Sequence, residues 1–225
     1  MAIVAIGFLS VLAMTLAVSW AGSGAAAELA RDPKVIVPAQ ILGYLVVIGF
    51  MAALLHSRGL PFWQGIHWHW PSLRGTRFAA AGAAMSLVVL AASRYLPVPS
   101  SVPMQEYFRD RLGAWFMTIF GITLAPLMEE LFFRGFLYPA LRRRIGLRQA
   151  LAATALLFAL LHARQYAYSW ALLLLLFLVG LALTWIRERT GSVAASFLFH
   201  AGYNAMLFGL LYFGTGGFRH LERMQ

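Results

Sequence analysis

The chain has 225 residues, of which 61% are hydrophobic and only 12% are charged, and its mean hydropathy is +0.73. Soluble domains carry about a quarter charged residues, so this composition excludes an ordinary soluble protein. Uncharged runs of about 20 residues are typical of membrane-spanning helices, and they lack the alternation that a membrane β-barrel requires. The absence of cysteine excludes disulfides, thiolate metal sites and a cysteine nucleophile.

Seven apolar runs are candidates for crossing the membrane, and no tract between them is long enough for a second domain. They cover residues 2–20, 35–56, 78–96, 112–138, 150–162, 167–186 and 192–213. We therefore predict an all-α fold, a polytopic membrane helical bundle of about seven to eight transmembrane helices, in a single integral membrane domain over residues 1–225. The first run resembles a signal peptide near Ala25–Ala27, but it lacks a positive n-region, so we expect it to be retained.

Arginines in the short gaps between these runs account for most of the net charge of +10. Such residues anchor helix ends and meet anionic lipids, so we expect membrane lipids as partners and no nucleic acid. The densest cluster, Arg142–Arg144 with Arg148, favours a cytoplasmic position for its loop. His67 and His69 alternate with tryptophans, which indicates an interfacial aromatic belt rather than a metal site, because no third ligand lies nearby.

Six charged or strongly polar residues interrupt the apolar runs, and they fall on only three of the seven. They are Glu129, Glu130, Arg134, His162, His200 and Asn204. An ionisable side chain at the centre of a bilayer costs about 2.5–3.5 kcal/mol on insertion scales, so such residues are rare there and usually functional. Each alone could be a structural hydrogen-bonding group, but their concentration on three helices favours a functional site.

The spacing of these residues suggests a division of roles. Glu130 and Arg134 are four residues apart, so they can form an ion pair on one helix face. Glu129 is rotated by about 100° from Glu130 and stays free for chemistry. A glutamate beside an imidazole can activate water. His200 and Asn204, also four apart, can donate hydrogen bonds to an oxyanion.

The three motifs resemble those of the CPBP intramembrane protease family, which includes the type II CAAX prenyl endopeptidases and the bacterial Abi proteins. The family pattern is E-E-x-x-x-R, F-x-x-x-H and H-x-x-x-N, in that order. This chain has Glu129-Glu130 with Arg134, then Phe158 with His162, then His200 with Asn204, within a motif-bearing core of residues 112–212. The resemblance implies an intramembrane endopeptidase that hydrolyses a peptide bond, as CAAX prenyl endopeptidases do.

The resemblance also implies a role for each matched residue. Glu129 and His162 would activate the attacking water, and His200 and Asn204 would stabilise the oxyanion. Glu130 and Arg134 would form a structural ion pair, with Phe158 in support. The family is treated as glutamate-dependent, so no cofactor is expected. The residues alone leave a zinc site open, with Glu129, His162 and His200 as ligands.

The expected partner is a peptide or protein substrate at the membrane, with or without a lipid, and the expected location is the bacterial inner (plasma) membrane. Other intramembrane proteases fit less well, because the chain has no H-E-x-x-H motif, no aspartate in an apolar run and no G-x-S-G turn. Two alternatives to an enzyme stay open. One is a non-catalytic membrane immunity or adaptor protein that retains the fold, and the other is a proton-coupled transporter.

Overall fold

A computed structural model describes residues 32–71 and 75–221, and these residues are almost entirely helical. The elements in chain order are α3 (Pro33–His56), α4 (Phe62–Gly65), α5 (Gly75–Ser93), η1 (Pro103–Phe108), α6 (Arg111–Ile122), α7 (Leu124–Glu130), η2 (Leu131–Leu137), α8 (Tyr138–Ile145), α9 (Leu147–Leu161), α10 (Trp170–Thr190) and α11 (Val193–Gly214). The all-α prediction is therefore confirmed.

Five helical stretches in the described part of the chain are long and apolar enough to cross a membrane. They are α3, α5, the continuous run from α6 to α8 (Arg111–Ile145), α10 and α11. The fifth predicted run, over residues 150–162, corresponds to α9 (Leu147–Leu161), a shorter apolar helix. The run predicted over residues 2–20 lies outside the described residues. The protein is an integral, polytopic membrane protein.

Helix ends follow from local sequence signals. Asp32 caps α3 by accepting a hydrogen bond from the backbone N–H of Lys34 at 2.9 Å. Gly191 ends α10 in the left-handed conformation with φ of 69°, which glycine adopts without steric cost. Ser192 then caps α11 by accepting from the N–H of Ala195. The chain thereby reverses direction between two long helices within two residues.

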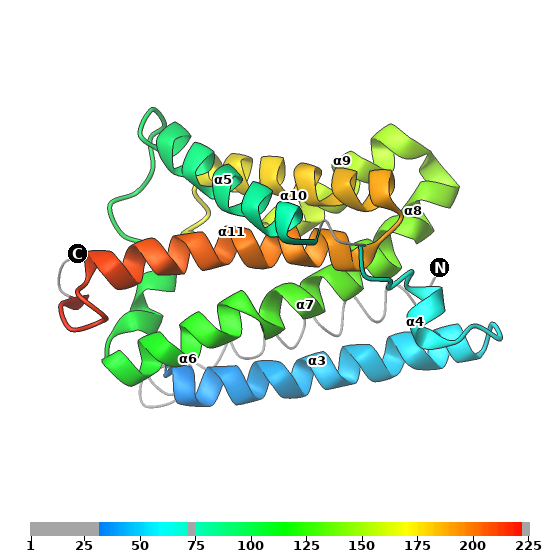
Figure 1. The fold of residues 1–225 in the computed structure, drawn as a ribbon, viewed down its shortest axis with the longest axis horizontal. Coiled ribbons are helices and arrows are strands. Elements are labelled where there is room, and N and C mark those ends of the chain that lie inside the picture. Colours follow the sequence, from blue (N-terminus) through cyan, green and yellow to red (C-terminus); the bar gives the residue numbers. More distant parts are fainter. Residues whose placement is uncertain (1–31, 72–74, 222–225) are drawn as a thin grey trace.

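Helix α11 runs through the middle of the bundle, with α5 and α10 on one side and α6, α7 and α3 on the other (Figure 1). Its closest neighbour is α5, and two glycines permit that approach. A Cβ added at Gly82 would lie 1.9 Å from the carbonyl oxygen of Phe199, and one at Gly202 would lie 2.1 Å from that of Ala79. Small residues that bring two backbones together are typical of helix packing in membranes.

The long run from α6 to α8 is interrupted at two places next to the glutamates. It breaks at Thr123, whose φ and ψ are −112° and −77°, and Pro126 follows within α7. The segment η2, directly after Glu130, is a π-helix. Because π-helical turns contain an extra residue, they change the direction of the side chains that follow them, and they often occur at functional sites.

One core cluster joins η2, α9, α10 and α11 beneath this irregular segment. Its buried members are Phe133, Leu137, Phe158, Val179, Leu183, Phe199 and Tyr203. The cluster fixes the relative positions of the three helices that carry the polar motifs.

Candidate active site

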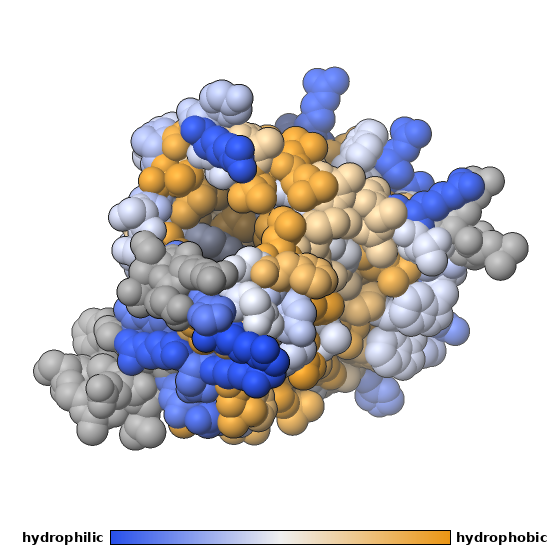
Figure 2. All heavy atoms as spheres, turned by 60° about the vertical axis from the view of Figure 1, so that its left-hand side comes forward, coloured by the Kyte–Doolittle hydropathy of each residue, from blue (hydrophilic) through white to orange (hydrophobic). Residues whose placement is uncertain are grey.

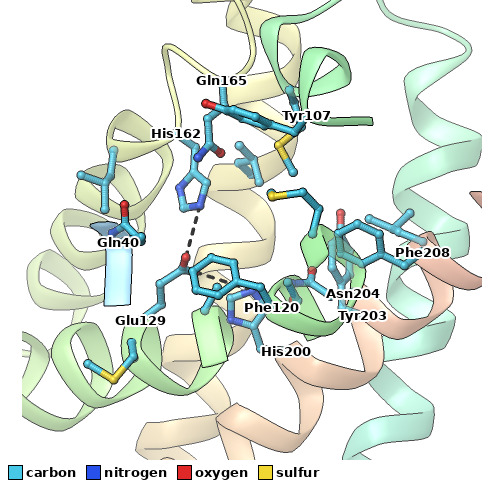
Figure 3. A pocket seen from close by; sticks show the side chains of 18 of the residues that line it. Gln40, Tyr107, Phe120, Glu129, His162, Gln165, His200, Tyr203, Asn204 and Phe208 are labelled. Atoms are coloured by element: carbon cyan, nitrogen blue, oxygen red, sulfur yellow. Dashed lines mark hydrogen bonds and ion pairs between the residues drawn. The ribbon is translucent and has the colours of Figure 1, made fainter. Parts of the chain in front are cut away.

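The polar residues predicted to act together meet where α7, the end of α9 and α11 approach one another (Figure 3). Glu129 and Glu130 are the last two residues of α7, and His162 is the C-cap of α9. His200 and Asn204 lie one turn apart in α11. Residues separated by up to 75 positions in the chain are thus neighbours in space.

Glu129 lies between two imidazole rings. Its Oε1 is 3.7 Å from Nε2 of His162, and its Oε2 is 3.8 Å from Nε2 of His200. The side chains of Glu129 and His162 are 16% and 15% exposed, and that of His200 is 6% exposed. These separations exceed an ordinary hydrogen bond, but they suit a water molecule that bridges the carboxylate and an imidazole.

Both rings are oriented through their other nitrogen. Nδ1 of His162 is 2.8 Å from the carbonyl oxygen of Phe158. A carbonyl can only accept, so this Nδ1 carries the proton and Nε2 is the nitrogen turned toward Glu129. Nδ1 of His200 is 2.9 Å from Oε1 of Glu130, a carboxylate oxygen, and therefore also donates. Each histidine thus presents Nε2 to the same carboxylate.

Arg134 is completely buried, and each of its three guanidinium nitrogens donates one hydrogen bond. Nη1 donates to Oε1 of Glu130 at 2.8 Å, and both side chains are 0% exposed. Nη2 donates to the carbonyl oxygen of Gly180 at 3.1 Å, and Nε donates to Oγ1 of Thr184 at 3.3 Å. The guanidinium also lies over the ring of Phe158, at 4.6 Å from its centroid. A buried ion pair needs such additional contacts, because its desolvation is costly.

The geometry adds a connection that the sequence spacing did not indicate. Oε1 of Glu130 accepts hydrogen bonds both from Arg134 and from His200. The ion pair within one helix is therefore linked directly to the histidine on α11. Gly180 and Thr184 on α10 were also missed, because a threonine and a glycine in an apolar helix give no distinctive sequence signal.

Asn204 lies near the histidines but has a partner elsewhere. Its Nδ2 donates to the carbonyl oxygen of Gly121 at 2.6 Å, which attaches α11 to the end of α6. An amide nitrogen has two hydrogens, so one donor remains available. Asn204 lines the same cavity as Glu129 and His200.

The site opens into a cavity of about 600 Å³. Most of its lining is apolar or aromatic, with Phe120, Phe132 and Phe208 among the side chains, and the four polar residues Glu129, His162, His200 and Asn204 lie together in it. The face drawn in Figure 2 is hollowed between hydrophobic side chains. Gln40, Tyr44, Gln165 and Tyr166 also line the cavity, and the sequence analysis did not identify them.

Among the described residues, no three histidine, aspartate or glutamate side chains are grouped so that they could hold a metal ion. His162 and His200 face different oxygens of Glu129 rather than one common point. The two histidines of the tryptophan-rich segment, His67 and His69, are likewise not part of such a group.

Comparison with known proteins agrees with the motifs. Residues 111–206 match the family model described as type II CAAX prenyl endopeptidase, Rce1-like. No curated protein and no solved structure matches the chain. The matched segment begins at the first residue of α6 and includes Glu129, Glu130, Arg134, His162 and the His200–Asn204 pair. The segment that contains the polar motifs is therefore similar to the type II CAAX prenyl endopeptidases of the Rce1-like group.

Proposed function

We propose that this protein hydrolyses a peptide bond of a membrane-associated peptide or protein, with Glu129 as the general base. The observation that supports this most is the position of the Glu129 carboxylate, between Nε2 of two imidazoles and inside a largely apolar cavity. In such a site an ionised carboxylate and a water molecule interact strongly, because few other polar groups compete for them.

In the first step, a water molecule held between Glu129 and His162 attacks the carbonyl carbon of the scissile bond. One proton of the water passes to the Glu129 carboxylate as the new C–O bond forms. His162 keeps its own Nδ1 proton on the carbonyl of Phe158, so its Nε2 can accept a hydrogen bond from the water. The two groups together orient the water for attack.

The tetrahedral intermediate carries negative charge on the former carbonyl oxygen. His200 and Asn204 supply donors to that oxygen, which is the role of an oxyanion hole. For His200 this requires a proton on Nε2 in addition to the one on Nδ1. The carboxylates of Glu129 and Glu130 lie on its two sides. Collapse of the intermediate breaks the C–N bond, and Glu129 returns its proton to the leaving amine.

Glu130 and Arg134 act as a support for this machinery rather than in the reaction. The hydrogen bond from Nδ1 of His200 to Glu130 fixes the orientation of the ring. Arg134 in turn fixes Glu130 through the contact at 2.8 Å. Phe158 completes the support, since its carbonyl orients His162 and its ring covers Arg134.

We propose further that the reaction needs no metal ion. The arrangement of the two imidazoles on different oxygens of Glu129 supports a water-mediated contact. We therefore expect that strong chelators of divalent metals leave cleavage unchanged, and that purified active protein contains far less than one equivalent of zinc by elemental analysis. Activity that is lost on chelation and restored by zinc would show instead that Glu129, His162 and His200 are metal ligands.

The substrate in this proposal carries a prenylated C-terminal CAAX sequence, or a hydrophobic segment of similar size, and the protein resides in the bacterial inner membrane. The apolar lining of the cavity suits a substrate of this kind. A direct comparison is the cleavage of a prenylated CAAX peptide and of the same peptide without its lipid, both added to protein reconstituted in vesicles. Equal rates for the two would contradict a lipid-dependent substrate class.

The test of the chemistry is the isosteric variant Glu129→Gln. It removes the base but keeps the size of the side chain, so cleavage should fall by about 10²-fold or more, while the protein still folds. Glu106→Gln is the matched control, because Glu106 pairs with Arg109 at a partly exposed position away from the two histidines. If Glu129→Gln retains wild-type cleavage, or if Glu106→Gln loses as much, Glu129 is not the base. A non-catalytic immunity or adaptor protein would keep its function in Glu129→Gln.

A further inference from the structure

Arg187, in the last turn of α10, is buried although one nitrogen of its guanidinium group is left without a hydrogen bond. Its exposed fraction is 7%, and its Nε has no hydrogen-bond partner. An isolated charge is costly to bury, and buried guanidinium groups are usually paired. The only acidic residue beside it in the sequence, Glu188, is already occupied, since Tyr138 donates to it at 2.6 Å and Arg142 at 3.5 Å. Glu188 still attracts Arg187 through its charge, but Nε of Arg187 is left without an acceptor among the described residues.

Other cationic and donor groups gather around this side chain. The segment from His67 to His69 is fixed against the turn between α10 and α11. There the backbone N–H of Val193 donates to the carbonyl of His67 at 3.3 Å, and the Ser192 hydroxyl donates to that of His69. Burial, together with the nearby charges of Arg187, His69 and Arg143, lowers the pKa of His67. Arg187, His69 and Arg143 thus each lie within electrostatic reach of His67.

The position of the cluster is at one surface of the bundle, away from the catalytic cavity. The helix α4, the end of α8 and the turn between α10 and α11 lie together at the right-hand end of Figure 1. Arg142, Arg143 and Arg144 form the last turn of α8, and Arg187 and Arg189 the last turn of α10. None of the residues at this end lines the cavity.

Exposed tryptophans place this surface at the level of lipid headgroups. Trp63 and Trp70 are 55% and 61% exposed, and both contact Trp68, which packs on Phe197 of α11. Tryptophan favours the boundary between the hydrocarbon core and water. A phosphate at the same depth would meet the arginines from the lipid side, and arginine binds phosphate through two parallel N–H donors.

We propose that Arg187, Arg143 and the His67–His69 segment form a binding site for the phosphate of an anionic membrane lipid. The lipid phosphate would supply the acceptor that Nε of Arg187 lacks and would connect α8, α10 and the loop before α5 at the membrane surface. This site is separate from the catalytic cavity, and the proposal does not depend on the peptidase mechanism.

The experiment is a titration of the purified full-length protein in detergent with phosphatidylglycerol, with bound lipid counted by native mass spectrometry. We expect phosphatidylglycerol to bind more tightly than phosphatidylcholine. Arg187→Gln and Arg143→Gln should each weaken its binding about fivefold, in line with the contribution of one arginine near a charged membrane surface. Arg189→Gln is the matched control, because Arg189 is in the same turn of α10 but is exposed and lies over Trp185. It should leave the binding unchanged.

Two outcomes would overturn the proposal. The first is that Arg143→Gln binds phosphatidylglycerol as the wild type does, or that Arg189→Gln weakens it equally. Arg143 is exposed, so its variant is expected to fold even if Arg187→Gln does not. The second is that an excess of inorganic phosphate displaces the lipid completely, which would identify a site for a soluble anion. Lipid that remains bound under excess phosphate supports the headgroup site.

Discussion

At the scale of single residues, the charged groups within the membrane are stabilised by a network that extends over three helices. Arg134 contacts Glu130 on its own helix and Thr184 and Gly180 on α10, and Glu130 also contacts His200 on α11. Every contact is buried, so each one is expected to contribute more than the same contact at a surface.

Thr184→Val should destabilise the protein, because the Thr184 hydroxyl accepts from Nε of Arg134 and donates to the Gly180 carbonyl at 2.7 Å. Removing it leaves Nε of a buried guanidinium unpaired, at a cost of about 1–3 kcal/mol. Thr154→Val is the matched control. Thr154 is also 0% exposed, but its hydroxyl has no hydrogen-bond partner, so a valine of the same shape should be neutral or stabilising.

Thermal unfolding of the two purified variants in one detergent measures this difference. We expect a lower midpoint for Thr184→Val only. Equal midpoints would mean that Thr184 does not support Arg134, and that the network ends at Glu130.

At the scale of helices, the site depends on how closely α5 and α11 approach each other. Gly82 and Gly202 lie at their contact, and each faces a backbone carbonyl of the other helix. His200 lies between Phe199 and Gly202 on α11, so any separation of the two helices would also displace the histidine. The close approach therefore serves the position of the site as well as the fold.

Gly202→Ala should separate these helices, because the added Cβ would lie 2.1 Å from the carbonyl oxygen of Ala79. This oxygen belongs to the backbone, so the clash can be relieved only by moving a whole helix. Overpacking of this kind costs typically 1–3 kcal/mol. Gly209→Ala on the same helix is the matched control, since nothing lies within 4 Å of its Cβ position. That variant should be neutral or more stable, because alanine favours helix by up to about 1 kcal/mol. Equal loss of thermal stability in both variants would contradict the close packing.

At the scale of the whole molecule, arginine is concentrated at the end that contains the last turns of α8 and α10. From the positive-inside rule we predict that this end faces the cytoplasm. The chain has no cysteine, so single cysteines can report the orientation without background. We expect an impermeant thiol reagent to label Tyr95→Cys in intact cells, because Tyr95 is 89% exposed and follows the far end of α5. Gln64→Cys in α4 should react only after permeabilisation, and the reverse pattern would contradict this orientation.

Much of this fold could be predicted from hydropathy alone, since each predicted run within the described residues coincides with a helix. The Glu130–Arg134 pair followed from spacing on one helix, which is a local property. The contact of Glu130 with His200 did not, because it depends on how α7 and α11 cross. The π-helical turn after Glu130 could not be predicted from the pattern of apolar residues either. This turn changes which side chains face the site.

In the proposed mechanism, Glu129 activates water rather than attacking the peptide itself. A single turnover with excess enzyme in ¹⁸O-labelled water tests it directly, with the product and the enzyme analysed by mass spectrometry. The account predicts one ¹⁸O atom in the new C-terminal carboxylate of the product and none in Glu129. An unlabelled product, with the label in the side chain of Glu129, would show that the carboxylate forms a covalent acyl intermediate and would contradict the account.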